Sequence, residues 1–267
     1  MARASVEGNE IVVYSQFADR DRCKAVPGAT WNRARRVWTY PLSPHVARGL
    51  LAEFPECAVD QSVLDLLEPL TPMDPSGMNL PLWRHQHEAV TDLSVMPGSM
   101  LAFDMGVGKT LAALTLCDTW DARRVLVICP KSVISVWPAE FVKHSPRRWQ
   151  VLPLEDGSVA KRTAAAERHL TTWRSLKQPL AVVVNYDAII REPLLQFLCD
   201  TPWDVFVMDE SHHIKAPAGK QSRACQRIAS SVPRRLGLTG TPMPHSPLDI
   251  YAQYRAIDPA IFGTSFV

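Results

Sequence analysis

The sequence predicts an α/β protein: a parallel β-sheet with helices on both faces, preceded by a small α+β module. From Leu82 onward, segments typical of strands and helices alternate along the chain, which indicates a parallel sheet. The strand segments 125–128 and 182–184 are wholly apolar, as expected when both faces of a sheet are covered. The third observation is a glycine-rich loop at residues 106–110 between a strand and a helix, a common phosphate-binding arrangement in α/β proteins.

The larger part of the chain has a strand and helix pattern that can be followed in order. The strands are expected over residues 99–103, 124–129, 151–154, 180–185, 205–209 and 235–239. The helices are expected over residues 84–93, 109–120, 133–143, 159–175 and 222–231. In an open parallel sheet, ligands bind beyond the carboxyl ends of the strands, so the residues that follow each strand are the candidates for function.

Residues 1–60 predict a small separate module. A strand is expected over 11–14, a helix over 19–25, and a hairpin whose strands, 30–32 and 37–40, flank a basic turn. Ser43 is expected to cap a helix that starts at Pro44 and runs to about residue 54. Prolines punctuate residues 61–81, which predicts a linker, with one helical turn over 63–67.

Composition excludes several classes of protein. The net charge is only +2, so any binding to nucleic acid must use local patches. The first residues contain no secretory signal, and no run approaches the roughly 20 apolar residues of a membrane span. We therefore expect a cytoplasmic protein of a bacterial cell or a virus-infected host, without a membrane partner. The six cysteines include no Cys-x-x-Cys pair, so reduced thiols are expected.

The glycine-rich loop predicts a phosphate site. Glycine has no Cβ, so Gly106 and Gly108 allow the loop to turn tightly and direct N–H groups at oxygens. Lys109, at the start of the next helix, is predicted to reach the phosphates, and the Thr110 hydroxyl to ligate magnesium. The residues expected to contact a nucleotide here are Met105, Gly106, Val107, Gly108, Lys109 and Thr110. The general P-loop pattern has glycine at the position of Phe103, so an ordinary glycine turn with a solvated lysine is the alternative.

An acidic pair follows a later buried strand. Asp209 and Glu210 come directly after the apolar segment 205–208. Asp209 is predicted to hold magnesium, and Glu210 to orient and deprotonate an attacking water. The alternative is an acidic pair that merely caps the next helix.

A third segment follows the last predicted strand. Thr239, Gly240 and Thr241 stand there, and their hydroxyls could bond the acidic pair and sense a phosphate. Taken alone, the segment could also be a simple turn rich in glycine and proline.

Together these segments resemble, in order, the motifs of superfamily-two helicases. They are residues 82–86, 104–110, 127–130, 209–212 and 239–242. The Swi/Snf-type DNA translocase branch is most similar; it favours Asp-Glu-Met-Gly-Leu-Gly-Lys-Thr in the loop and alanine where this chain has Ser211. The resemblance covers residues 82–266. It implies a RecA-like fold, ATP and Mg²⁺ as ligands, ATP hydrolysis, and double-stranded or branched DNA as partner.

The resemblance also implies roles for single residues. Gln86 would read the adenine edge, and Lys109, Asp209 and Glu210 would be catalytic. Thr239, Gly240 and Thr241 would couple hydrolysis to movement. Lys131 and Ser132 would lie near the nucleic-acid backbone, although Lys131 could equally be a solvated loop lysine.

The N-terminal module has a looser likeness. Residues 31–38 resemble the tryptophan-bounded hairpin of HARP-type modules, which are found beside the motor of annealing helicases. Arg33, Arg35 and Arg36 supply charge, and Trp31 a ring that could stack on a base, so these residues are predicted to bind DNA. The alternative is a solvated basic hairpin whose tryptophans form its own small core.

In this family a second RecA-like lobe supplies arginines that complete the ATP site, and the chain ends at Val267. We therefore expect this chain alone to bind Mg-ATP, hydrolyse it slowly and not translocate, because an arginine finger contributes roughly 10³–10⁵ in rate. A split motor completed in trans, a truncated product and a module that uses ATP only as a ligand all remain open. Alternatives for function are a non-catalytic, ATP-gated DNA-binding protein and an RNA helicase fragment.

Overall fold

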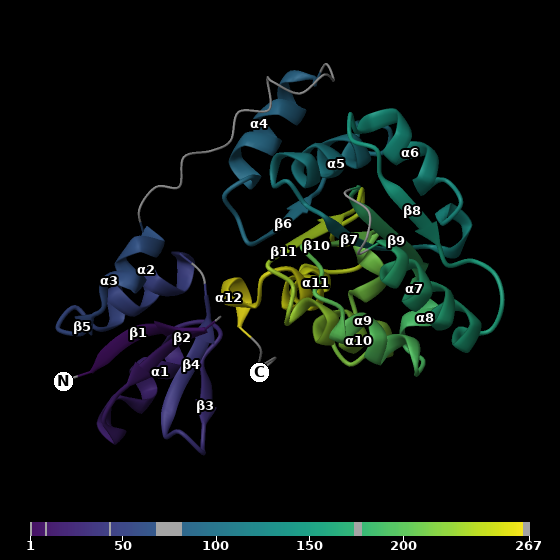
Figure 1. Cartoon of the computed structure of the whole chain (residues 1–267). Helices are drawn as coiled ribbons and strands as arrows, with labels where there is room; N and C mark the ends of the chain where they lie inside the picture. Colours follow the sequence, from purple (N-terminus) through teal and green to yellow (C-terminus); the bar gives the residue numbers. More distant parts are fainter. Residues whose placement is uncertain (1, 9, 43, 68–81, 174–177, 264–267) are drawn as a thin grey trace. The chain divides into compact units, whose positions relative to one another are not determined.

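The computed structural model describes residues 2–8, 10–42, 44–67, 82–173 and 178–263. The chain divides into two compact units (Figure 1). The smaller comprises Met1–Leu70 with Asp258–Val267, and the larger comprises Thr71–Ile257.

The larger unit contains a six-stranded sheet in the order β6-β11-β10-β7-β9-β8. All neighbouring strands are parallel. The strands are β6 (Gly98–Leu101), β7 (Arg124–Cys129), β8 (Gln150–Pro153), β9 (Leu180–Asn185), β10 (Val205–Asp209) and β11 (Arg234–Leu238). The predicted parallel α/β fold is confirmed, and three of the predicted strands, 124–129, 180–185 and 205–209, agree with it at both ends.

Helices cover both faces of this sheet (Figure 1). One layer contains α4 (Arg84–Leu93), α5 (Lys109–Thr119) and α6 (Trp137–His144); the other contains α7 (Val159–Trp173), α8 (Tyr186–Ile189), α9 (Leu194–Asp200), α10 (Lys220–Ala229) and α11 (Asp249–Ile257). Successive strand residues alternate between the two layers. In β10, Val205 and Val207 pack under α5 and α6, whereas Phe206 and Met208 pack against the other layer. The central stretches of β7, β9 and β10 are apolar because helices cover both faces of the sheet there.

The helix predicted over 133–143 differs from the structure. A short 3₁₀ helix, Lys131–Val133, comes first, and α6 begins only at Trp137. Pro138 lies in the first turn of α6, where its missing N–H costs nothing; further inside a helix its ring would clash with the carbonyl four residues earlier. The helix therefore has to start just before this proline.

The smaller unit contains a five-stranded sheet in the order β3-β4-β2-β1-β5. Its strands are β1 (Arg3–Glu7), β2 (Glu10–Tyr14), β3 (Thr30–Asn32), β4 (Val37–Pro41) and β5 (Ala58–Val59). Its helices are α1 (Arg20–Ala25), α2 (Pro44–Glu53) and α3 (Gln61–Leu64), with 3₁₀ turns at Phe17–Asp19 and Asp65–Leu67. The predicted hairpin is confirmed by antiparallel pairing of β3 with β4. Strands β1 and β5 were not predicted, and the expected cap at Ser43 lies outside the described residues.

Of the two segments that flank the predicted large lobe, the N-terminal one agrees with expectation where it is described, and the C-terminal one does not. The helical turn expected within residues 63–67 is present, and Val63 is fully buried in the core of the smaller unit. The remainder of the expected linker, 68–81, lies outside the described residues. At the other end, α12 (Pro259–Phe262) packs on α2 and β4 of the smaller unit, because Ala260 is small enough to be buried there. Residues 258–263 therefore join the smaller unit, where we had expected one lobe through residue 267.

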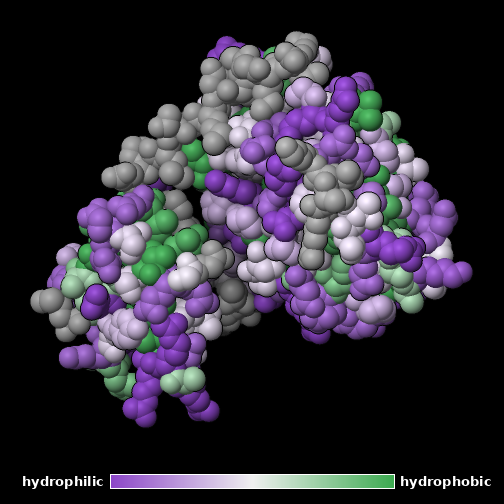
Figure 2. Space-filling view, viewed as in Figure 1, coloured by the Kyte–Doolittle hydropathy of each residue, from purple (hydrophilic) through white to green (hydrophobic). Residues whose placement is uncertain are grey.

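On the face shown in Figure 2, hydrophilic side chains predominate over the larger unit. Within the described ranges, no helix has both the length and the apolar character that crossing a bilayer requires.

Candidate functional site

The glycine-rich loop joins β6 to α5 with two left-handed residues. Gly106 has φ 78° and Gly108 has φ 87°, a region that side chains other than glycine rarely adopt. A Cβ on Gly108 would lie 2.2 Å from Gln86 Nε2, whereas one on Gly106 would meet nothing within 4 Å. Gly108 is thus required both by its conformation and by the close approach of Gln86.

Gln86 holds this loop against α4. Its side chain is only 3% exposed; Nε2 donates to the Val107 carbonyl at 3.0 Å, and Oε1 accepts the Trp83 N–H at 2.9 Å. The acceptor and one amide hydrogen are therefore engaged within the protein. A contact with a ligand would use the second Nε2 hydrogen.

Phe103, at the position where the general pattern has glycine, has an aromatic partner. Its ring meets the His85 ring edge-on, with centroids 5.4 Å apart. His85 Nε2 in turn lies 3.2 Å from the Val107 carbonyl oxygen. The phenylalanine thus contributes to fixing the loop, since edge-on ring pairs are favourable beyond their buried area.

Lys109 lies between the loop and the segment after β11. Its Nζ donates to the carbonyls of Phe103 and Asp104, at 3.0 and 3.1 Å. A Cβ on Gly240 would lie 3.6 Å from this Nζ and 3.5 Å from Met105 Cγ. The loop and residue 240 meet because β6 and β11 are adjacent in the sheet.

Asp209 ends β10, and Trp137, at the start of α6, hydrogen-bonds its carboxylate. The alternation along β10 agrees with this contact, because residues 205 and 207 also face the α5 and α6 layer. Burial, and then repulsion from Glu210, raise the pKa of Asp209 from 3.8 to about 6, although the Lys109 charge opposes the shift. The ionised carboxylate is therefore held at a cost in folding free energy.

Removing this charge is expected to stabilise the metal-free protein. The folded-state pKa of Asp209 lies above its unfolded value, so the cost is fully present above about pH 6 and disappears below the unfolded pKa. In EDTA at pH 8, Asp209→Asn should raise the free energy of unfolding by about 1–3 kcal/mol, and by less at pH 5. Urea denaturation at the two pH values measures this difference.

Asp204→Asn is the matched control for that experiment. Asp204 accepts the N–H groups of Arg123 and Arg124 at 2.8 Å each and pairs with the Arg124 guanidinium, so its replacement should lower stability at pH 8. Equal stability of Asp209→Asn and the unmodified protein at both pH values would contradict the assigned burial cost.

Glu210 begins a polar cluster that reaches the segment after β11. Its backbone is left-handed, with φ 49°, which turns the chain sharply after the strand. His212 Nδ1 lies 3.3 Å from Glu210 Oε2, 3.2 Å from Thr239 Oγ1 and 3.4 Å from Thr241 Oγ1. Burial lowers the pKa of His212, so the ring is neutral at pH 7. The tautomer of the neutral ring sets whether Nδ1 donates in this cluster or accepts from a threonine hydroxyl.

Ser211 and Gln253 form a second link, and both are fully buried. Ser211 Oγ donates to Gln253 Oε1 at 2.8 Å. Gln253 Nε2 donates to the carbonyls of Pro242 at 2.7 Å and Asp249 at 2.9 Å. One glutamine on α11 thus ties the acidic pair to the end of the 239–242 segment. Ser211 had been interpreted only as a small substitution for alanine, and Gln253 was not predicted.

Tyr186 was also missed by sequence reasoning, as was its stack with two histidines. Its hydroxyl donates to the Asp209 carbonyl at 2.8 Å, and its ring stacks on His213, which stacks on His212, each pair 5.1 Å apart. A tyrosine following an apolar strand carries no signal of such a role. The contact exists because β9 ends close to the acidic pair in the folded sheet.

The structure thus brings together most of the predicted nucleotide residues, and places the predicted DNA residues elsewhere. Thr110 lies in the first turn of α5, next to Lys109. Lys131 and Ser132 are exposed after β7, where Lys131 lines a hollow of about 230 Å³ with Arg162 and Arg191. Trp31, Arg33, Arg35 and Arg36 belong to the smaller unit, and the Arg35 guanidinium pairs with Glu7.

Comparison with known proteins gives consistent matches. The model of the SNF2-related domain family matches residues 38–266. The rice DNA repair and recombination protein RAD54 is 29% identical over 175 residues, covering 62% of this chain and 17% of RAD54. Protein p41 of Acyrthosiphon pisum secondary endosymbiont phage 1 is 31% identical over 187 residues, covering 65% of this chain and 38% of p41. The chain thus spans well under two thirds of these relatives.

A solved structure has the same fold. The Sulfolobus solfataricus SWI2/SNF2 ATPase core in complex with dsDNA superimposes with a TM-score of 0.56 at 24% identity, over 71% of this chain and 38% of that one. The predicted RecA-like fold and the predicted Swi/Snf-type resemblance are confirmed. The HARP-type likeness of the smaller unit stays a prediction.

Proposed function

The chain belongs to the SNF2-related domain family, and we propose that its larger unit is the ATP-binding lobe of an ATP-dependent DNA helicase or translocase. One observation carries the proposal. Lys109, Asp209 and the 239–241 segment follow β6, β10 and β11, which are neighbours in the sheet. The groups that we propose to bind phosphate, to bind the metal and to couple hydrolysis are therefore gathered at one edge, where parallel sheets bind ligands.

The residues present fit a nucleotide with its metal. The backbone of residues 105–108 and the Lys109 ammonium would hold the phosphates of ATP, and the remaining Nε2 hydrogen of Gln86 would meet the adenine. Thr110 and Asp209 would hold Mg²⁺, which when bound neutralises phosphate charge. Asp209 is buried beside Glu210, so a cation there would relieve repulsion between the two carboxylates.

Glu210 would act as the general base. As water attacks the γ-phosphorus and the bond to ADP breaks, its carboxylate would take a proton from the water. His212 holds Glu210 Oε2 and also contacts Thr239 and Thr241. A shift of Glu210 during hydrolysis would therefore move His212, which contacts both threonines. This supports the proposed coupling role of Thr239 and Thr241 together with Gly240.

DNA is the proposed partner. Lys131 and Ser132, exposed after β7, would contact the backbone of double-stranded or branched DNA, and Trp31, Arg33, Arg35 and Arg36 would supply a second contact from the smaller unit. The chain covers 38% of the SWI2/SNF2 ATPase core. We propose that a second lobe, supplied in trans, completes the site for rapid hydrolysis.

Steady-state ATP turnover, with and without duplex DNA, tests the proposal. The 267-residue chain should bind Mg-ATP, and any DNA-stimulated turnover, alone or with an added second lobe, should fall about 10²–10⁴-fold in Glu210→Gln. Binding of Mg-ATP should survive this substitution.

Two results would contradict parts of the proposal. Binding without turnover in any combination, with DNA affinity altered by ATP, would indicate a non-catalytic, ATP-gated DNA-binding protein. Turnover that is unchanged in Glu210→Gln would show that Glu210 is not the general base.

A further inference from the structure

The smaller unit contains an open pocket that none of the proposed ATP chemistry uses. It lies between the 3₁₀ turn at Phe17–Asp19, α1 and the β3–β4 hairpin, and has a volume of about 540 Å³. That volume is within the range of roughly 300–1,000 Å³ typical of small-molecule sites. Its lining combines three aromatic rings, of Phe17, Trp31 and Trp38, with the cationic side chains of Arg20 and Lys24.

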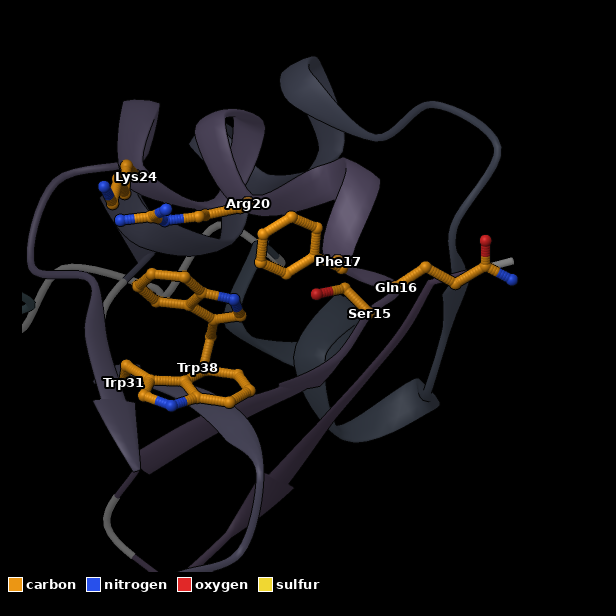
Figure 3. Close-up of a pocket in the computed structure, with 7 residues that line it drawn as sticks. All are labelled: Ser15, Gln16, Phe17, Arg20, Lys24, Trp31 and Trp38. Carbon is orange, nitrogen blue, oxygen red and sulfur yellow. The ribbon is translucent and has the colours of Figure 1, made fainter. Parts of the chain in front are cut away.

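The aromatic part of the pocket consists of one buried ring, that of Trp38, and two exposed rings, those of Trp31 and Phe17. Trp31 and Trp38 are directly opposed in the hairpin register, with ring centroids 5.3 Å apart (Figure 3). Trp38 is 8% exposed and belongs to the core of the unit, whereas Trp31 is 46% and Phe17 86% exposed. Exposed rings beside a fixed indole leave a planar, apolar face available to a flat ligand.

The cationic part of the pocket has no counter-charge bound to it in the part of the chain that the structure describes. Arg20 and Lys24 are four residues apart on α1, and Figure 3 shows their head groups next to each other beside Trp38. Like charges at this spacing destabilise a helix. Arg22 on the same helix pairs with Glu56 and Asp19, but neither Arg20 nor Lys24 forms an ion pair within the described residues, and no described lining residue is acidic.

We propose that this pocket holds an unpaired base of a DNA strand. The base stacks on the exposed indole of Trp31 and against Phe17, and a neighbouring phosphate lies at Arg20 and Lys24. A pocket with a flat apolar wall and two cationic side chains complements a ligand in which an aromatic ring is joined to an anion. A quaternary ammonium ligand, the other common occupant of aromatic pockets, is repelled by those cations.

A pocket that holds an unpaired base is expected to bind single strands in preference to duplexes. Bases inside a duplex are already stacked and paired, so only an unpaired base can enter a lateral pocket without a cost in unstacking. Stacking tolerates any base, so little sequence preference is expected. The choice of DNA as the anionic aromatic ligand rests on the proposed function, whereas the pocket itself belongs to a different unit from the ATP site.

Fluorescence anisotropy with the full chain, without nucleotide, tests the inference. Three dye-labelled probes are compared: a short oligothymidylate, an abasic oligonucleotide of the same length and charge, and a blunt duplex. We expect the abasic probe to bind about 5- to 100-fold more weakly than oligothymidylate, because stacking on aromatic side chains contributes that much per base. Equal affinity for the two single strands would overturn the proposal.

Two matched pairs of variants locate the contact. Trp31→Ala should lose the preference for the base-containing strand over the abasic strand, whereas Tyr14→Ala, 44% exposed on β2 outside the pocket, should keep that preference. Arg20→Gln with Lys24→Gln should make the slope of the salt dependence for single strands shallower by about 0.7, the value for loss of one phosphate contact. Arg48→Gln, exposed on α2, should leave that slope unchanged.

The outcomes separate this inference from the proposed function. Full preference retained by Trp31→Ala, with an unchanged melting temperature, would overturn the pocket as the site, and so would equal loss in Tyr14→Ala. Competition by free thymidine monophosphate at concentrations near the strand affinity would assign the pocket to a free nucleotide instead. Failure to bind Mg-ATP would refute the proposed function and leave a measured single-strand preference standing.

Discussion

Lys109→Ala is expected to weaken Mg-ATP binding by at least about 10²-fold. Within the described residues the Lys109 ammonium donates to the carbonyls of Phe103 and Asp104, and its proposed ligands are phosphate oxygens. A hydrogen bond to a charged partner contributes roughly 1.5–3 kcal/mol, and loss of two such bonds exceeds a factor of 10² in affinity. Titration with a fluorescent ATP analogue in excess Mg²⁺ measures the effect.

Lys131→Ala is the matched control. Lys131 also follows a strand of the same sheet, but its proposed ligand is DNA, so its removal should spare ATP affinity and weaken duplex binding. The two lysines should therefore show reciprocal effects. Lys109→Gln, whose amide can still bond the two loop carbonyls, separates loss of charge from loosening of the loop. An ATP affinity within threefold of the unmodified chain in both Lys109 variants would show that this loop is not the phosphate site.

Gln253→Leu is expected to destabilise the larger unit by about 2–4 kcal/mol. Leucine fills a similar volume but leaves the buried Ser211 Oγ and the part-buried Pro242 carbonyl without their Gln253 partner. Each unsatisfied buried polar group costs about 1–3 kcal/mol, and partial relaxation reduces the sum. Ser211→Ala should cost only about 1 kcal/mol, since Gln253 keeps its two carbonyls. Urea unfolding measures both values.

Gln196→Leu is the control for that substitution. Gln196 is exposed on α9 and bonds Asp200, so its replacement should change stability by less than about 0.5 kcal/mol. The double variant of Ser211 and Gln253 should be less destabilised than the sum of the two single variants, because the two side chains share one bond. Additive costs, or a Gln253→Leu stability equal to that of the control, would contradict the assigned link.

Much of the larger unit could be predicted because its signals are local. The apolar runs of β9 and β10 end at polar residues and that of β7 ends before a proline, so their limits could be predicted from the residues themselves. Strand β1 was missed because it places only Ala4 and Val6 toward the interior, and small or single apolar residues give weak alternation. The start of α6 was placed too early because residues 133–137 fit a helical pattern. The position of Pro138, which has to lie in the first turn of a helix, would have corrected it.

The candidate site likewise contains residues that could be predicted from local sequence and residues that could not. Gly108, Lys109, Asp209 and Glu210 could be predicted as candidate site residues, because the residue types and their position after a strand carry the signal. Trp137 beside Asp209, and Gln253 beside Ser211, could not be predicted. A buried serine signals that some partner exists, but not which of the polar residues on other elements provides it.

By itself, the sequence determined the order of the six strands of the larger unit, the glycine-rich loop and the acidic pair, because these depend on residues within a few positions of each other. Only the tertiary structure decided that Gln253 joins the acidic pair to Pro242, that α12 packs with the N-terminal residues, and that Trp31 lines one pocket with Arg20 and Lys24. Those contacts join segments far apart in the chain, and their partners are selected by how strands pair and helices pack rather than by any local pattern.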